Sequence, residues 1–214
     1  MSSILITAGP TREKIDPVRF ISNYSTGRFG YEIAKEAKRR GHKVTLVSGP
    51  TSLARPKGIR FIAVESARDM MKVLSKEFPG CGCLIMAAAV SDWRVKSAAK
   101  RKIKRGPGGK SLELMENPDI VKALARRKGR RVVAGFALET EDLARDALKK
   151  LKAKNLDIII ANKLAAGAAI FGDNPANILI MDRFGRRVEV RRRSKKYLAK
   201  IILDKVLSFN INLA

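Results

Sequence analysis

The sequence has very few of the residues on which zinc sites, disulfide frameworks and histidine catalysis depend. It contains one histidine and two cysteines, and Cys81 and Cys83 are separated by a single glycine. That spacing is neither a CxxC motif nor part of a disulfide framework, so no structural zinc site is expected, and two free thiols indicate a reducing compartment. His42 follows a glycine at an expected helix end. A surface role is therefore expected for it, and histidine-centred catalysis is not.

Long apolar runs are absent as well. No stretch of about 18 consecutive apolar residues occurs, so no membrane span is expected. The first residues contain no basic region followed by an apolar core, so no signal peptide is expected. Together with the free thiols, these features predict a cytoplasmic protein. Because 45% of the residues are hydrophobic, the chain can still bury a sizeable core, and its 214 residues suit a single domain over positions 1–214.

Negative charge is scarce. Lys and Arg number 45 against 20 Asp and Glu, which gives a net charge of +25. This surplus predicts an anionic partner or substrate, and nucleic acid, anionic lipid and phosphorylated metabolites all satisfy it. Residues 96–110 are basic, contain glycine and are poor in apolar residues, so we expect a mobile loop there. A second basic cluster, at 191–196, has no role that the sequence explains.

Apolar runs alternate with amphipathic stretches along most of the chain. We expect strands at residues 4–8, 43–48, 60–64, 84–90, 131–137 and 156–162, and helices at 30–40, 66–78, 117–128 and 141–154. Alternation of this kind predicts an α/β fold with a three-layer, Rossmann-like and mostly parallel sheet. Strands at 176–182 and 187–193 around an Arg-Phe-Gly turn predict a C-terminal antiparallel hairpin extension, followed by a helix at 194–208.

Three of these helices have start signals. Ser66 and Asp69 resemble a capping box. Asn117 is expected to be an N-cap, with Pro118 as the first helical residue and an acid in the first turn. Thr140 is expected to cap the helix that begins at residue 141.

A glycine-rich segment follows the first strand. Gly9 directly follows that strand, and Ser25, Gly27 and Gly30 lie at the entrance to the first helix. Glycines let a ligand approach the backbone, and a helix N-terminus offers free N–H groups, so the segment suits phosphate binding. An ordinary strand-to-helix loop is the alternative. The dinucleotide fingerprint fits poorly, because a long segment intervenes and the second strand ends without an acid.

Several short segments occur in an order that is typical of one enzyme family. They are residues 6–13 (ITAGPTRE), 15–19 (IDPVR), 21–23 (ISN), 25–27 (STG), 87–94 (AAAVSDWR), 102–105 (KIKR), 117–120 (NPDI), 135–140 (GFALET) and 154–162 (KNLDIIIAN). In this order they resemble phosphopantothenate–cysteine ligase, an enzyme of coenzyme A biosynthesis. In many prokaryotes that ligase is the C-terminal half of a bifunctional flavoprotein.

The resemblance implies a reaction in two steps. The carboxylate of 4′-phosphopantothenate first receives a nucleotidyl group from CTP, with ATP as the alternative donor, and pyrophosphate leaves. The amine of L-cysteine then displaces the nucleoside monophosphate. No protein nucleophile is needed, which agrees with the scarcity of histidine and cysteine. Because both reactants of the first step are anionic, cations must offset their repulsion, and Mg²⁺ is expected.

The resemblance also implies roles for single residues. Asn23 would hold the acyl-nucleotide intermediate, and Lys102 would stabilise charge during nucleotidyl transfer. The residues implied in nucleotide binding are Met86, Ala87, Ala88, Asp92, Lys102, Pro118, Asp119, Ile120, Val121, Phe136, Lys150 and Lys154. Gly9, Ser25, Gly27 and Gly30 would form a phosphate or substrate loop. The metal ligands are not identified.

For partners, the resemblance implies a homodimer and a flavin-dependent decarboxylase domain or protein. The hairpin at 176–193 is a candidate dimer element, because its edges need covering. Two other classes of function remain as alternatives. A basic nucleic-acid-binding protein would explain the charge, but no binding motif is recognisable and three tyrosines with one tryptophan supply few stacking groups. An NAD(P)-dependent reductase is disfavoured by the poor dinucleotide fingerprint.

Overall fold

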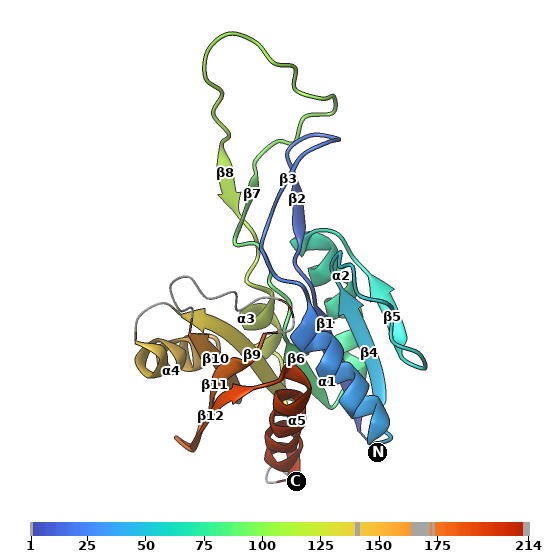
Figure 1. Cartoon of the computed structure of the whole chain (residues 1–214), viewed down its shortest axis with the longest axis vertical. Helices are drawn as coiled ribbons and strands as arrows, with labels where there is room; N and C mark the ends of the chain where they lie inside the picture. Colours follow the sequence, from blue (N-terminus) through green and yellow to red (C-terminus); the bar gives the residue numbers. More distant parts are fainter. Residues whose placement is uncertain (1, 140–141, 164–171, 173, 212–214) are drawn as a thin grey trace.

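The computed structural model describes residues 2–139, 142–163, 172 and 174–211, with the backbone alone at 163, 210 and 211. Eight strands of this part form one sheet in the order β12-β11-β10-β9-β6-β1-β4-β5 (Figure 1). Their bounds are β1 Ser3–Ala8, β4 Lys43–Ser48, β5 Arg60–Ala63, β6 Cys83–Met86, β9 Val132–Glu139, β10 Ile158–Lys163, β11 Ala176–Asp182 and β12 Arg187–Arg193. Six neighbouring strands of this sheet pair in parallel, namely β10, β9, β6, β1, β4 and β5. Strands β11 and β12 pair antiparallel at one end. The predicted fold class is confirmed.

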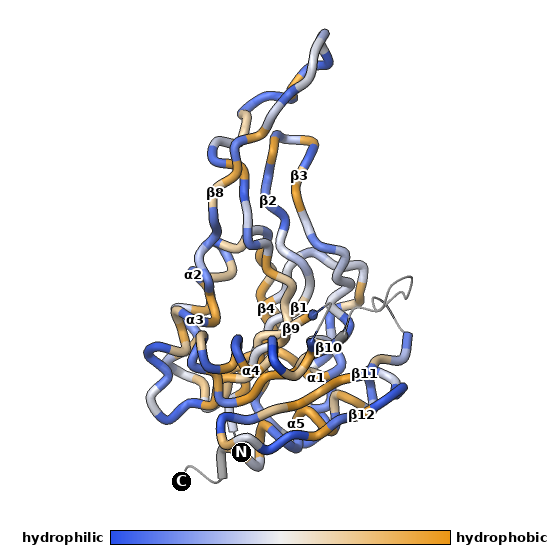
Figure 2. The backbone as a smooth tube through the Cα atoms, turned by 90° about the vertical axis from the view of Figure 1, so that its left-hand side faces the viewer, coloured by the Kyte–Doolittle hydropathy of each residue, from blue (hydrophilic) through white to orange (hydrophobic). Residues whose placement is uncertain are grey.

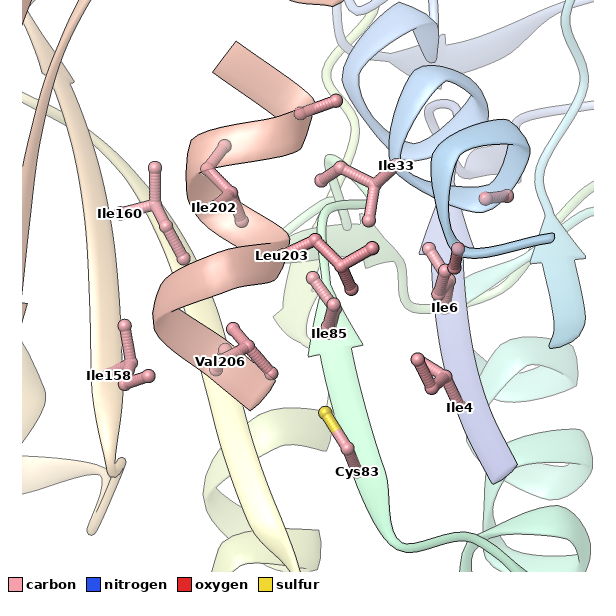
Figure 3. Packing of buried hydrophobic residues seen from close by; sticks show 14 of the residues in the cluster. Ile4, Ile6, Ile33, Cys83, Ile85, Ile158, Ile160, Ile202, Leu203 and Val206 are labelled. Atoms are coloured by element: carbon pink, nitrogen blue, oxygen red, sulfur yellow. The ribbon is translucent and has the colours of Figure 1, made fainter. Parts of the chain in front are cut away.

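Helices cover both faces of the sheet. Helices α1 (Arg28–Arg39) and α5 (Lys195–Ile211) pack on one face, and α2 (Ala67–Glu77), α3 (Ile120–Ala125) and α4 (Leu143–Ala153) pack on the other. Figure 3 shows Leu203 of α5 and Ile33 of α1 against Ile6 and Ile85 of the sheet. Each such side chain contributes about 1.5–3 kcal/mol when it is fully buried.

Strand β1 shows why the central strands read as continuous apolar runs. Ile4 and Ile6 belong to the core under α1 and α5, whereas Leu5 between them belongs to the core under α2, α3 and α4. Because successive side chains point to opposite faces, a strand covered on both faces needs apolar residues at every position. Figure 2 shows these apolar stretches gathered in the sheet.

The predicted helix starts have different outcomes. The capping box is confirmed, since Ser66 Oγ accepts from Asp69 N–H at 3.1 Å and Asp69 Oδ2 accepts from Ser66 N–H at 3.0 Å. Asn117 is not an N-cap: α3 begins at Ile120, and Asp119 caps it by accepting from Lys122 N–H at 3.1 Å. The reason is tertiary, because Asn117 Nδ2 donates to the Ser91 carbonyl at 2.9 Å.

Two further helix boundaries differ from the predicted ones. Helix α3 ends at Ala125, short of the expected residue 128. Helix α4 begins at Leu143 with Asp142 as its N-cap, and Asp142 accepts from Arg145 N–H at 3.1 Å. The expected cap at Thr140 lies outside the described residues.

Two antiparallel ribbons rise from the sheet as a protruding arm (Figure 1). One is the hairpin of β2 (Arg12–Lys14) and β3 (Phe20–Ser22), and the other pairs β7 (Trp93–Val95) with β8 (Leu114–Glu116). We call residues 12–22 and 93–116 the arm. None of these strands was predicted, and the expected strand at 84–90 ends at Met86. Strands of three residues with mostly exposed side chains are too short to show an alternating pattern.

Candidate functional site

Two adjacent cavities open at the carboxyl ends of the parallel strands. The larger has a volume of about 720 Å³ and the smaller about 180 Å³. They share a wall that is formed by Ala88, Ala89, Phe136, Ala137 and Leu138. In open α/β sheets, ligands bind at this edge, so the two cavities form one candidate site.

The large cavity collects most of the residues that the motifs single out. Asn23 reaches it from the base of the arm, directly after β3, and Lys150 and Lys154 reach it from α4 and its C-terminal end. The other predicted residues in its lining are Met86, Ala88, Asp92, Pro118, Asp119, Ile120, Val121 and Phe136. Segments that are far apart in the sequence therefore meet here, as the resemblance implied.

Hydrogen bonds hold the segment that follows β6 in a defined shape. Ala88 N–H donates to Thr7 Oγ1 at 3.0 Å, and Asn23 Nδ2 donates to the Ala89 carbonyl at 3.0 Å. Ala89 N–H in turn donates to the Gly9 carbonyl at 2.9 Å. Because the side chains at 87–89 are methyl groups, a ligand in either cavity can approach this backbone closely.

The two lysines of α4 each face an acidic residue. Lys150 Nζ lies 2.8 Å from Glu139 Oε1, and Lys154 Nζ lies 3.2 Å from Asp119 Oδ2. Both lysine side chains remain partly exposed to the cavity, at 44% and 33%. An anionic ligand can therefore compete with these carboxylates for the two ammonium groups without unfolding any element.

The small cavity lies at the N-terminus of α1. Ser25, Thr26, Gly27, Arg28 and Phe29 line it, together with Ala87, Asn162 and Lys195. Gly27 is the N-cap of α1 with φ of 79°, and no side chain caps the helix. Free N–H groups at a helix start, together with Arg28 and Lys195, suit a phosphate group.

Asn162 and Lys195 were missed as site residues. Asn162 is buried and lies at the carboxyl end of the parallel strand β10, a position that could have drawn attention to it. Lys195 is also buried, and its Nζ donates to the Gly172 carbonyl at 2.6 Å and lies 5.2 Å from the Phe29 ring centroid. No sequence pattern predicts that Lys195 lines this cavity, because its position depends on how α5 packs.

Gly9 and Gly30 belong to neither cavity lining. A Cβ atom on Gly30 would lie 2.5 Å from the Thr7 carbonyl oxygen and 2.6 Å from Ala8 Cβ. The absence of a side chain at Gly30 therefore lets α1 approach β1, which places the helix N-terminus beside the small cavity. Of the predicted phosphate loop, Ser25 and Gly27 line the small cavity directly.

The structure does not bring Lys102 to either cavity. It lies on the arm, in a groove that it shares with Val18, Arg19, Lys104 and Arg105. Figure 1 shows the arm extending away from the sheet edge at which the cavities open. Within one copy of the chain, Lys102, the expected catalytic lysine, is therefore separated from Asn23 in the large cavity.

The described part of the site offers neither a thiol nor an imidazole group. Cysteine and histidine are absent from the lining of both cavities. Cys81 and Cys83 are buried in the core, where burial raises the pKa of the Cys81 thiol to about 11 and that of Cys83 further still. These thiols are inert at neutral pH. Over the described residues, no group of three or more His, Cys, Asp or Glu side chains gathers to hold a metal.

This arrangement defines a class of protein. It is a three-layer α/β domain with paired cavities at the carboxyl edge of its sheet, and the exposed backbone, the amide and the lysines of their lining suit phosphorylated ligands. Residues 1–209 match the family described as DNA/pantothenate metabolism flavoprotein C-terminal domain, and the chain belongs to that family. The resemblance that the motifs carry is confirmed.

Curated relatives support the same family. The chain is 42% identical over 208 residues to the coenzyme A biosynthesis bifunctional protein CoaBC of Bacillus subtilis (strain 168), covering 97% of this chain and 51% of that protein. It is 39% identical over 203 residues to the protein of the same name from Vibrio cholerae serotype O1, covering 94% and 51%. The chain thus spans about half the length of the curated relatives it matches.

Solved structures agree with the fold. A crystal structure of the C-terminal domain of coenzyme A biosynthesis bifunctional protein CoaBC matches with a TM-score of 0.83 and 37% identity, covering 96% of this chain and 93% of that one. A Cab2 mutant in complex with phosphopantothenate-cysteine matches with a TM-score of 0.78 over 99% of this chain and 87% of that one. At 18% identity, the second match shows the fold alone.

No helix within the described residues is both long enough and apolar enough to span a membrane.

Proposed function

We propose that the chain joins 4′-phosphopantothenate to L-cysteine at the expense of a nucleoside triphosphate, in the cytoplasm. One observation carries the proposal: the two cavities share a wall, and Asn23 hydrogen-bonds to that wall at Ala89. Two anionic ligands can therefore meet at one point. The names of the relatives, which refer to coenzyme A biosynthesis, agree with such a reaction.

We assign the nucleotide to the large cavity and the substrate phosphate to the small one. A volume of about 720 Å³ lies within the range of about 300–1,000 Å³ that small-molecule sites occupy. Lys150 and Lys154 then approach the nucleotide. The free N–H groups of α1, with Arg28 and Lys195, approach the phosphate of phosphopantothenate.

The chemistry follows from this placement. A carboxylate oxygen of phosphopantothenate attacks the α-phosphorus of the nucleotide, and the bond to pyrophosphate breaks. The cysteine amine then attacks the carbonyl carbon of the mixed anhydride, and the nucleoside monophosphate leaves with the electron pair of the broken C–O bond. We propose that Asn23 Nδ2 donates to the carbonyl oxygen as negative charge develops there.

CTP is our proposed donor, with ATP as the alternative, and Mg²⁺ is proposed to enter with it. Magnesium in nucleotide sites is held by one or two carboxylates together with the substrate phosphates, and it keeps several waters. The donor set fits this pattern, because Asp92 and Glu116 are exposed in the large cavity. The ion would reduce the repulsion between the two anions.

A homodimer is proposed to complete the site. Exposed apolar side chains gather on the arm, where Val18 is 60%, Phe20 46%, Trp93 49% and Leu114 45% accessible. This favours contact through the arm, while the hairpin of β11 and β12 stays the predicted alternative. An arm supplied by a second copy would bring Lys102 to a cavity that its own chain does not reach. Sedimentation equilibrium of the wild type and of Phe20→Asp tests the arm contact.

A flavin-dependent decarboxylase domain or protein is the proposed partner in the pathway. The curated relatives are bifunctional proteins of about twice this length, so a second activity accompanies this region in them. Co-purification with such a flavoprotein, tracked by flavin absorbance, tests the partnership.

The decisive experiment is a nucleotide panel. CTP, ATP, GTP and UTP are each incubated with phosphopantothenate, with and without cysteine, and pyrophosphate and product mass are measured. We expect pyrophosphate release that depends on phosphopantothenate, and a ligated product only with cysteine. Lys102→Gln should lose the first step, whereas Asn23→Ala should retain it and fail in the second. If none of the four nucleotides supports pyrophosphate release, the proposed function is refuted.

A further inference from the structure

One carboxylate joins the two ribbons of the arm. The Asp16 side chain, in the turn between β2 and β3, is fully buried although it lies on a protruding arm. Its Oδ1 accepts from Val18 N–H at 2.8 Å and Arg19 N–H at 2.9 Å. Its Oδ2 accepts from Arg19 Nε at 3.0 Å and from Ile103 N–H at 3.1 Å. The last of these bonds crosses from the hairpin to the basic loop.

Arg19 also links the hairpin to the basic loop, through the carbonyl group of Ile103. Its Nη2 donates to the Ile103 carbonyl at 2.7 Å while also donating to Asp16 Oδ2 at 2.5 Å. Both backbone groups of Ile103 are therefore held. A second tie lies a few residues earlier, where Ala99 N–H donates to the Ile15 carbonyl at 2.9 Å. Lys102 sits between these two ties.

The rest of the basic loop is different. Residues 104–112 form no hydrogen bond or ion pair in the structure. A Cβ atom added at Gly106, Gly108 or Gly109 would meet nothing within 4 Å. The loop thus has a tied part that ends at residue 103 and an untied, glycine-containing tip that begins immediately after it.

We infer that Asp16 is a positioning residue for Lys102: it fixes the backbone next to the lysine, so that the ammonium group is presented from the arm before any ligand binds. This inference rests on the proposed function. Both oxygens of the Asp16 carboxylate are buried and accept from N–H groups of the arm, so Asp16 acts through Lys102 rather than on a ligand. Holding a catalytic group in place beforehand reduces the entropy lost when the transition state forms.

The negative charge of Asp16 matters for this positioning role. Burial works to raise the pKa of this carboxyl group, but the N–H groups of Ile103, Val18 and Arg19 together with the Arg19 side chain outweigh it and hold the pKa well below its usual range. The group is therefore an acceptor-only carboxylate at any working pH. An amide in its place would turn N–H donors toward other donors.

The test compares Asp16→Asn with Glu113→Gln. Glu113 is a matched control, because it is an exposed carboxylate on the same arm that pairs with Lys96 at 2.7 Å. Single-turnover pyrophosphate release reports the first step. Delivery of the purified acyl-nucleotide to cysteine reports the second.

For Asp16→Asn we expect pyrophosphate release to slow at least tenfold, with the KM of both substrates within threefold and the second step unchanged. A residue that served only the overall fold would slow both steps together. Ile103→Pro removes the N–H donor and leaves the Asp16 turn intact, so it should give the same pattern even if Asp16→Asn folds poorly. Glu113→Gln should match the wild type within twofold.

Limited trypsin digestion tests the tether without any catalysis. In the wild type, cleavage after Lys104 and Arg105 in the untied tip should be fast, and cleavage after Lys102 should be at least tenfold slower. Asp16→Asn should remove that difference. Equal cleavage in the wild type, or a normal first step in both tether variants, would overturn the inference. Loss of the first step in the wild type would instead refute the proposed function, and the digestion would still report on the tether.

Discussion

Replacing Asp157 tests the principal buried ionic cluster of the domain. Its side chain is 1% exposed and lies just before β10. Oδ2 accepts from Val133 N–H at 2.9 Å, and Oδ1 accepts from Lys128 Nζ at 2.7 Å and Arg183 Nη1 at 3.0 Å. The change Asp157→Ala removes one acceptor from three donors, of which the Val133 amide and Lys128 are buried.

The cost can be estimated donor by donor. A buried amide that loses its acceptor costs about 1–3 kcal/mol. Breaking a buried ion pair from one side costs about 3–5 kcal/mol, because the remaining charge is uncompensated. Lys128 Nζ would keep only the Asn155 carbonyl at 2.8 Å, which does not neutralise it. Arg183 is 37% exposed and can turn to water, so it adds little.

These contributions overlap, so we expect Asp157→Ala to lower the free energy of unfolding by about 3–5 kcal/mol. For a domain of this size that corresponds to a fall in Tm of about 6–20 °C. Urea denaturation followed by circular dichroism measures it. Asp157 lines neither cavity, so pyrophosphate release at 25 °C should stay within twofold of the wild type.

The double variant Asp157→Ala/Lys128→Met separates the two costs. Without the ammonium group no buried charge is left unpaired, so at least half of the lost stability should return. A loss below about 1 kcal/mol for the single variant would contradict the reasoning. So would a double variant that is no more stable than the single one.

Other predictions concern charge, thiols and acid. Lys150→Met should raise the KM for the nucleotide about tenfold, because the lysine lines the large cavity and is partly exposed there; steady-state kinetics check it. Cys81 and Cys83 should react with iodoacetamide in the folded protein only slowly at pH 8, because burial raises both thiol pKa values, and rapidly in urea; mass spectrometry follows the alkylation. Glu36 hydrogen-bonds to Arg39, which lowers its pKa from 4.5 to about 2, so its stabilising contribution is complete above pH 4.5 and is lost as the pH falls toward 2. Glu36→Gln should flatten the unfolding free energy across that interval in acid titrations, and an unchanged slope would contradict the assignment.

Much of the fold could be predicted because its signals are local. The strands at 43–48, 176–182 and 187–193 have the predicted bounds, since apolar runs and the Arg-Phe-Gly turn mark them. The Ser66 capping box was readable for the same reason: both of its hydrogen bonds join residues three apart. Asn117 misled because its side chain bonds to Ser91, a partner 26 residues away.

The sequence by itself determined the α/β class, the order of the main strands and helices, and eleven of the 23 residues that line the large cavity, because each follows from patterns within short stretches of chain. Tertiary structure alone decided where those residues stand. It built the arm, whose three-residue strands have no pattern of their own, and it brought Lys195 to the N-terminus of α1 through the packing of α5. It also placed Lys102 beside Asp16 and away from Asn23, because hydrogen bonds between segments 87 residues apart leave no mark on either segment alone.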